Sequence, residues 1–166
     1  MAVLAGDRTY AADLNILGVV ARAVRTSAKT PITTETGYLR IDDIPVVNGF
    51  AYKIYTSNLT LDSSSDGEIG AARIRVVQSA SPGTAATTSS TQIGMRRSYQ
   101  DANANADLGP LITDYFAGSD GYLSVILTAQ RVTALGTFQM FASSSEPCHL
   151  IVQCIGTDPG DTGVSL

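Results

Sequence analysis

The chain has 166 residues, the length of a single domain, and a domain of this size buries roughly two-thirds of the surface that its unfolded chain exposes. Only 16% of the residues are charged, the net charge is −4, and the basic residues are dispersed apart from pairs such as Arg73/Arg75 and Arg96/Arg97. These features argue against a nucleic-acid groove, which needs a concentrated positive field, and no apolar run approaches the roughly 18 residues that cross a bilayer.

Residues 1–16 differ from the rest of the chain and are predicted to form an N-terminal arm. They lack the basic and then apolar stretches of a Sec-type signal peptide, so we expect the chain to fold in a cytoplasm. Residues 11–17 could form one helical turn, which is marginal when isolated. Either the arm becomes ordered against another molecule, or it wraps over its own domain. The candidate contact residues in the arm are Arg8, Tyr10, Leu14 and Ile16.

From residue 17 onward the hydrophobic period is two, which is typical of half-buried β-strands. The first predicted strands cover residues 17–26, 38–44 and 50–56. Asn48 and Gly49 lie between the second and the third, and an Asn-Gly pair is a strong signal for a two-residue β-turn. The sequence therefore predicts a hairpin between residues 38–47 and 50–57.

Strands and polar loops alternate through the rest of the chain. Polar loops are predicted at residues 61–70, 80–90 and 101–107. Further strands are predicted around residues 72–76, 92–100, 108–116, 121–132, 137–142 and 148–155. In the strand at 121–132, Leu123, Val125 and Leu127 should face inward.

Eight to ten short strands without room for crossover helices predict an all-β fold, an antiparallel β-sandwich. A jelly roll is the favoured version, because the number and length of the strands fit two four-stranded sheets. The expected organisation is the arm at 1–16, the sandwich at 17–156 and a polar, glycine-rich C-terminal tail at 157–166. Asp158 and Asp161 are the candidate contact residues of the tail; they invite a calcium site, but a turn at Asp158-Pro159-Gly160 explains them more simply.

The two cysteines and the single histidine share one predicted strand. Cys148 and Cys154 are about 20 Å apart along an extended strand, whereas a disulfide needs Cα atoms within about 7 Å. They have the same parity as Leu150 and Val152, so we expect two buried hydrophobic thiols. His149 should point to the opposite face, which leaves too few ligands for a metal site and argues against a catalytic role.

Other chemistry is weakly indicated. Asp62, Asp66 and Glu68 could gather around a calcium ion, but their spacing fits a solvated turn better. There is no phosphate loop, metalloprotease helix or nucleophile elbow, and no tryptophan to stack on a sugar. The seven tyrosines suit recognition, the core or subunit contacts equally well. We therefore predict no catalytic residue, no cofactor and no metal.

Four stretches carry a resemblance to a known family. Residues 20–26, 33–46, 52–59 and 158–164 resemble β-sandwich virion proteins of tailed phages that infect actinobacteria, which serve as head decoration proteins or as minor tail and fibre modules. The similarity covers most of residues 10–164 and includes no catalytic motif.

The resemblance implies a non-enzymatic, trimeric virion component, made in the cytoplasm of the bacterial host. The first hypothesis is a capsid decoration protein on the outer surface of the head, whose partners are its own copies and the major capsid protein. The alternative is a minor tail or fibre module that binds a host cell-wall glycan. A small carbohydrate-active enzyme or lectin unrelated to phage is a third class.

Overall fold

The computed structural model describes residues 18–100 and 105–157, and this part of the chain is all β. The arm at 1–16 and the tail residues from 158 onward, with their candidate contacts, lie outside the described residues. The strands are β1 (Gly18–Arg25), β2 (Thr36–Val46), β3 (Phe50–Ser57), β4 (Thr60–Ser63), β5 (Glu68–Ser79), β6 (Thr91–Gln100), β7 (Asn105–Asp107), β8 (Ile112–Phe116), β9 (Gly121–Arg131), β10 (Phe138–Phe141) and β11 (Cys148–Thr157).

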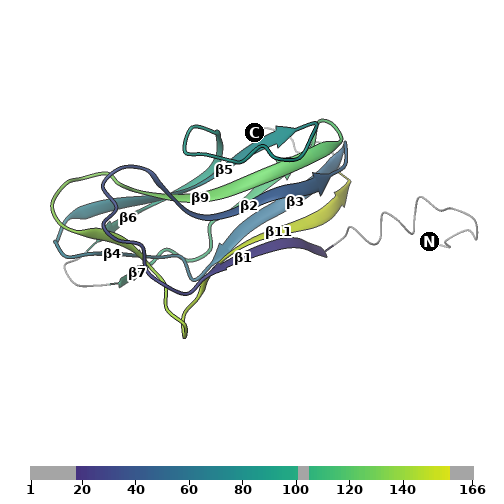
Figure 1. The fold of residues 1–166 in the computed structure, drawn as a ribbon. Helices are drawn as coiled ribbons and strands as arrows, with labels where there is room; N and C mark the ends of the chain where they lie inside the picture. Colours follow the sequence, from purple (N-terminus) through teal and green to yellow (C-terminus); the bar gives the residue numbers. More distant parts are fainter. Residues whose placement is uncertain (1–17, 101–104, 158–166) are drawn as a thin grey trace, which may run out of the picture.

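Eight of these strands form the two layers of a sandwich (Figure 1). One sheet has the order β1-β11-β3-β8 and the other has the order β2-β9-β5-β6. Among these eight strands the first pairs with the last, β2 with β9, β3 with β8, and β5 with β6, all antiparallel. A long antiparallel ribbon rolled up in this way is a jelly roll, so the predicted fold is confirmed.

The three remaining strands are short and form a third sheet, in the order β10-β4-β7. β4 follows β3 after two residues, one of which, Asn58, has a positive φ of 51°. Two predicted loops therefore contain strand segments. Residues 61–70 include β4 and the start of β5, because Leu61 and Ser63 are buried and pair with β10, and β7 lies within residues 101–107.

The core between the layers comes from alternate residues of the long strands. On β9, Leu123, Val125 and Leu127 are fully buried, as predicted. On β11, all the inward positions are buried, including both cysteines, and the cysteines are free. Gly70 has a packing reason to lack a side chain, because a Cβ atom there would lie 2.4 Å from the ring of Phe138.

The predicted hairpin at Asn48-Gly49 is wrong. β2 pairs with β9, and β3 pairs with β11 and β8, so the turn carries the chain from one sheet to the other. Gly49 does adopt the positive φ that the turn requires, 76°. The turn is held from outside, since Asn48 N–H donates to Asp120 Oδ1 over 2.8 Å and Gly49 N–H donates to the carbonyl of Ala117.

The domain boundary also moves slightly. β11 continues to Thr157, so the first residue of the predicted tail belongs to the sandwich. Gly156, with a φ of 110°, lies at a register shift between Cys154 and the end of the strand. The extra residue of this β-bulge allows Gly156 and Thr157 to resume pairing with Ala51 and Phe50.

Candidate functional site: two sheet faces, a tip and a cleft

The acidic residues predicted to form a turn or a calcium site have separate roles. Glu68 is fully buried and accepts hydrogen bonds from Thr133 Oγ1 (2.7 Å) and from the N–H groups of Leu135 and Gly136. Asp62 accepts a hydrogen bond from Gln139, and Asp66 is exposed. No cluster of three potential metal ligands occurs in residues 18–100 and 105–157. Glu68 therefore fastens the β9–β10 loop rather than binding a cation.

Glu68 also titrates as a structural carboxylate. Burial alone would raise its pKa, but the hydrogen bonds from Thr133, Leu135 and Gly136 and the charge of Arg131 outweigh burial and lower the pKa. Its charged form is thus stabilised by the fold.

Cys148 and His149 cannot work together as nucleophile and base. The thiol of Cys148 faces the core, and burial raises its pKa to about 12, so it is protonated at neutral pH. His149 faces the other side of β11, in register with Val24 of β1 and Ser57 of β3, and its Nδ1 has no hydrogen-bond partner in the described part of the chain.

The outer face of the β2-β9-β5-β6 sheet is covered by the chain's own loops. The outward side chains of its central strand β9, Ser124, Ile126 and Thr128, are 1%, 7% and 0% exposed. Loop 80–90 lies over this face: Gly83 N–H donates to Asp43 Oδ1, and Ser90 accepts from Arg75 Nη1 over 2.9 Å. Most of this loop is exposed, as predicted, but Ala86 within it is fully buried.

A charged cluster lies under this cover. Glu35, just before β2, accepts hydrogen bonds from Arg75 Nε (2.6 Å), Arg75 Nη2 (2.9 Å) and Thr128 Oγ1 (2.6 Å), and Arg73 Nη1 lies 3.6 Å from its carboxylate. Burial would raise the pKa of Glu35, but these hydrogen bonds and the two guanidinium charges lower it. The cluster links the segment between β1 and β2 to β5 and β9. Its role is therefore to stabilise the fold.

The outer face of the β1-β11-β3-β8 sheet, in contrast, is not covered by residues 18–100 or 105–157. Residues directly opposite one another on neighbouring strands point to the same side, so the register defines rows across this face. One row is Arg22, Ile151, Tyr55 and Ile112, and the next is Val19, Gln153, Lys53 and Asp114. We call this surface the open face.

The open face is unusually apolar for a surface exposed to water. Of the ten exposed large hydrophobic side chains among the described residues, five belong to this sheet: Val19, Val24, Ile112, Phe116 and Ile155. Ile112 and Phe116, both on the edge strand β8, are 55% and 53% exposed. An antiparallel sheet whose outer face meets water normally places polar side chains there. Apolar residues at these positions indicate a surface that becomes covered.

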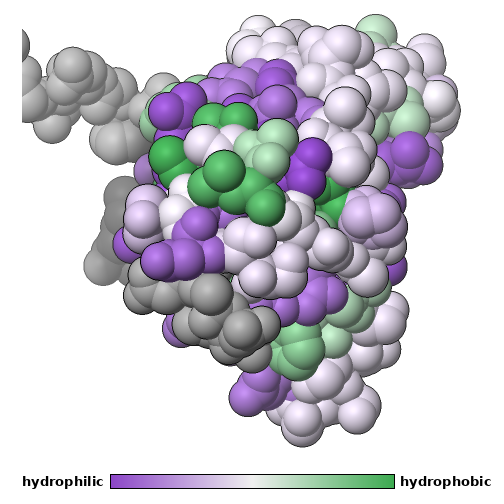
Figure 2. Space-filling model, turned by 90° about the vertical axis from the view of Figure 1, so that its left-hand side faces the viewer, coloured by the Kyte–Doolittle hydropathy of each residue, from purple (hydrophilic) through white to green (hydrophobic). Residues whose placement is uncertain are grey.

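A second apolar surface lies at one end of the sandwich (Figure 2). Ile69 of β5 is in register with Tyr99 of β6, and Val132 N–H donates to the Ile69 carbonyl. Tyr99 and Leu135 both lie against Gly67 and are 64% and 58% exposed. Figure 2 shows a compact hydrophobic patch at this end, bordered by hydrophilic side chains. We call these four residues, Ile69, Tyr99, Val132 and Leu135, the apolar tip.

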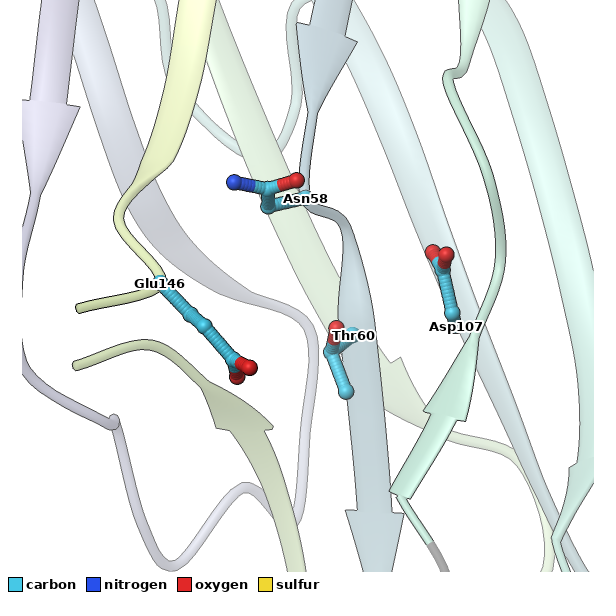
Figure 3. Close-up of a pocket in the computed structure, with 4 residues that line it drawn as sticks. All are labelled: Asn58, Thr60, Asp107 and Glu146. Carbon is cyan, nitrogen blue, oxygen red and sulfur yellow. The ribbon is translucent and has the colours of Figure 1, made fainter.

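A polar cleft of about 300 Å³ is lined by Asn58, Thr60, Asp107 and Glu146 (Figure 3). Two of these side chains are already engaged: Asn58 Nδ2 donates to the Pro147 carbonyl over 3.1 Å, and Asp107 Oδ1 accepts from Gly109 N–H over 2.8 Å. Carboxylates, an amide and a hydroxyl can hydrogen-bond to sugar hydroxyls, but none of the four offers a ring for stacking.

The sequence did not reveal these surfaces. It predicted which side chains alternate, but both sheets have outward positions, and only the fold shows that one set is covered. A sequence signal for the open face is that Ile112 and Phe116 have the same parity as Asp114. Two large apolar side chains therefore share the outward side of the predicted strand with this acid.

Comparison with known proteins adds little beyond architecture. No protein-family model matches the chain, and no curated protein is similar to it in sequence. The model contains no helix that could span a membrane in the described segments.

Several solved structures match the chain at low similarity. A Clostridium thermocellum xylanase structure, complexed with xylohexaose, is 8% identical with a TM-score of 0.40 over 91% of this chain, which spans 28% of that structure. A xylan-binding domain from Paenibacillus barcinonensis is 9% identical with a TM-score of 0.33, covering 83% of this chain and 88% of that one. A structure of infectious bursal disease virus is 10% identical with a TM-score of 0.37, covering 82% and 38%. Similarity at this level carries no information about ligand or activity.

Proposed function

We propose that this protein is a non-enzymatic structural component of a phage virion: a trimeric capsid decoration protein on the outer surface of the head. Its partners are its own copies and the major capsid protein, and it is made in the cytoplasm of the bacterial host. The observation that carries the proposal is the open face, a sheet surface on which five large hydrophobic side chains are exposed in the described part of the chain.

Two further features support an assembly role. The carboxylates of half-buried Glu35 and buried Glu68 are saturated by hydrogen bonds within the fold, so neither is held ready for proton transfer. The four stretches that resemble virion proteins point to the same class. The predicted arm suits attachment to a finished shell, because ordering a short segment can bury apolar side chains such as Leu14 and Ile16 on another subunit.

The proposal is tested by deleting residues 1–16 and measuring sedimentation with purified heads that lack this protein. The full chain should sediment with the heads, whereas the shortened chain should stay in the supernatant while keeping its folded spectrum and its oligomeric mass. A doubly substituted arm, Leu14→Ser with Ile16→Ser, keeps the length and should bind weakly for the same reason. Undiminished binding by both variants would contradict the role of the arm, and failure of the full chain to bind would contradict decoration.

A minor tail or fibre module that binds host cell-wall carbohydrate is the second candidate, and the polar cleft is the observation that favours it. In that case the full chain would bind fragments of the host cell wall, and Glu146→Gln would weaken this binding. Asp66→Asn, an exposed acid away from the cleft lining, is the matched control. Glycan binding that survives Glu146→Gln would leave the cleft without a role.

A further inference from the structure

We infer that a second copy of this chain covers the open face, with the β1 edge of one copy against the β8 edge of the other, so that Arg22 of one copy pairs with Asp114 of the next. This inference rests on the proposed function, which requires self-association, and assigns the surface that carries it.

The size of the open face suits a subunit contact. Four strands at about 4.8 Å spacing and about eight residues at about 3.3 Å give a rectangle of about 19 by 26 Å, on the order of 500 Å² in projection. The accessible area is larger because side chains project from the sheet. A stable contact buries about 800 Å² of accessible surface on each partner, which this face with its borders can supply.

The composition of the open face also fits. One complete row holds Arg22, Ile151, Tyr55 and Ile112, the next holds Val19, Gln153, Lys53 and Asp114, and Phe116 lies at the end of β8. Protein interfaces are enriched in aromatic residues and arginine and depleted in other charges at their centre. The two rows hold three charged residues: Arg22 and Asp114 lie on the two outermost strands, and Lys53 lies on β3 opposite Asp114.

The positions of those two charges favour a second copy over an unrelated partner. Within one chain Arg22 and Asp114 are separated by three strand spacings, about 14 Å, which is too far for an ion pair. No ion pair of either residue occurs within residues 18–100 and 105–157. Both are exposed, and they occupy neighbouring rows.

Two such faces complement each other when their strands are roughly aligned, as packed sheets usually are. Rotation about an axis along the strands places β1 over β8 and β11 over β3, and leaves each row at its own height. Arg22 then lies above the row of Ile112, one row from Asp114 of the other copy, within reach of its long side chain. A symmetric pair forms this contact twice. Because the rotation is twofold, the contact can join two trimers but cannot itself close a ring of three.

Charge reversal tests the contact directly. Arg22→Glu and Asp114→Arg are each made in the full chain, and molar mass is measured by light scattering over a range of concentrations. Each reversal should weaken self-association about tenfold or more, because it opposes like charges across the interface. The double variant R22E/D114R should associate as the original chain does. An equimolar mixture of the two single variants should also recover association, which no change within one chain can explain.

Two controls keep the test interpretable. Lys53 lies opposite Asp114 in the same sheet, so thermal unfolding must show that Asp114→Arg remains folded. Arg40→Glu reverses an exposed arginine on β2, outside the open face, and should leave association unchanged.

The outcomes separate the inference from the proposed function. Oligomers that form equally well in both single variants, or single variants that fail to recover on mixing, would overturn the assigned contact while leaving a virion role intact. A chain that is monomeric at every concentration and does not bind heads would overturn both.

Discussion

The two sheets of this sandwich differ in how the outward side chains of their outer faces are covered. On β9 the outward residues are buried because loop 80–90 and the segment before β2 fold over them, and this cover encloses a hydrogen-bonded ionic cluster around Glu35. On β3 and β11 the outward residues are not covered in this way by any described part of the chain, and their row ends in exposed Ile112. A face covered by its own chain can hold polar side chains, because the fold fixes their hydrogen-bond partners. Exposed apolar side chains on the open face indicate contact with another subunit.

The largest loss of stability should come from removing the carboxylate of Glu35, which lies under the cover of the β2-β9-β5-β6 sheet. Glu35→Ala leaves Arg73 and Arg75 close together without a carboxylate, and breaking a buried ion pair costs about 3–5 kcal/mol, reduced here to about 2–3 because Glu35 is partly exposed. Urea unfolding measures this loss. Glu146→Ala, an exposed acid, should change the free energy of unfolding by less than about 0.5 kcal/mol. Equal effects of the two substitutions would show that the cluster does not hold the cover.

Acid should weaken the contacts that Glu35 and Glu68 make within the fold. Glu35 and Glu68 have folded-state pKa values below their unfolded values, so in acid the unfolded chain binds more protons than the folded chain. Their contribution is fully present above the unfolded pKa of about 4.3 and is lost as the pH falls through the lowered folded values. The melting temperature should therefore fall below about pH 4, and E35Q/E68Q should flatten that fall. An unchanged slope in the double variant would contradict this assignment.

Polar substitutions on the open face should separate association from stability. Ile112→Ser with Phe116→Ser removes exposed apolar area, so the free energy of unfolding of the monomer should change by less than about 1 kcal/mol. Self-association should become undetectable at micromolar concentration by analytical ultracentrifugation. Leu135→Ser at the apolar tip is the matched control, because it also replaces an exposed hydrophobic residue. Association that is lost in the control and retained in the double variant would transfer the contact to the tip.

The smallest effect is expected at the histidine. His149→Ala alters an outward residue of the open face whose Nδ1 has no partner in the described residues, so stability should change by less than about 0.5 kcal/mol. Thermal unfolding of the monomeric fraction measures this. Destabilisation above about 2 kcal/mol would reveal a hidden structural bond, and loss of a turnover activity would contradict the non-enzymatic account.

The sequence predicts the strands well because alternation is a local property. The inward sets on β9 and β11 follow from a period of two, including the buried thiols of Cys148 and Cys154. The Asn48-Gly49 turn was also recognised, but a turn signal does not say whether the next strand stays in the same sheet. That choice depends on Ala117 and Asp120, which are distant in sequence.

The covered face and the open face could not be predicted from the sequence, because they also depend on contacts between residues that are far apart in the chain. The ionic cluster joins Glu35 to Arg75 and Thr128, which are 40 and 93 residues away, and Glu68 contacts Thr133, which is 65 residues away. Polar residues at such positions look like solvated loop residues until their partners are known. Likewise, the open face exists only because strands from both ends of the chain meet in one sheet.

The most direct test of an assembly role is to count this chain in the particle that carries it, by quantitative mass spectrometry of purified virions and of heads without tails. The account predicts many copies, in a fixed ratio to the major capsid protein and equally abundant on heads without tails. Absence of the chain from both preparations would contradict it, and a handful of copies confined to tails would favour the carbohydrate-binding alternative.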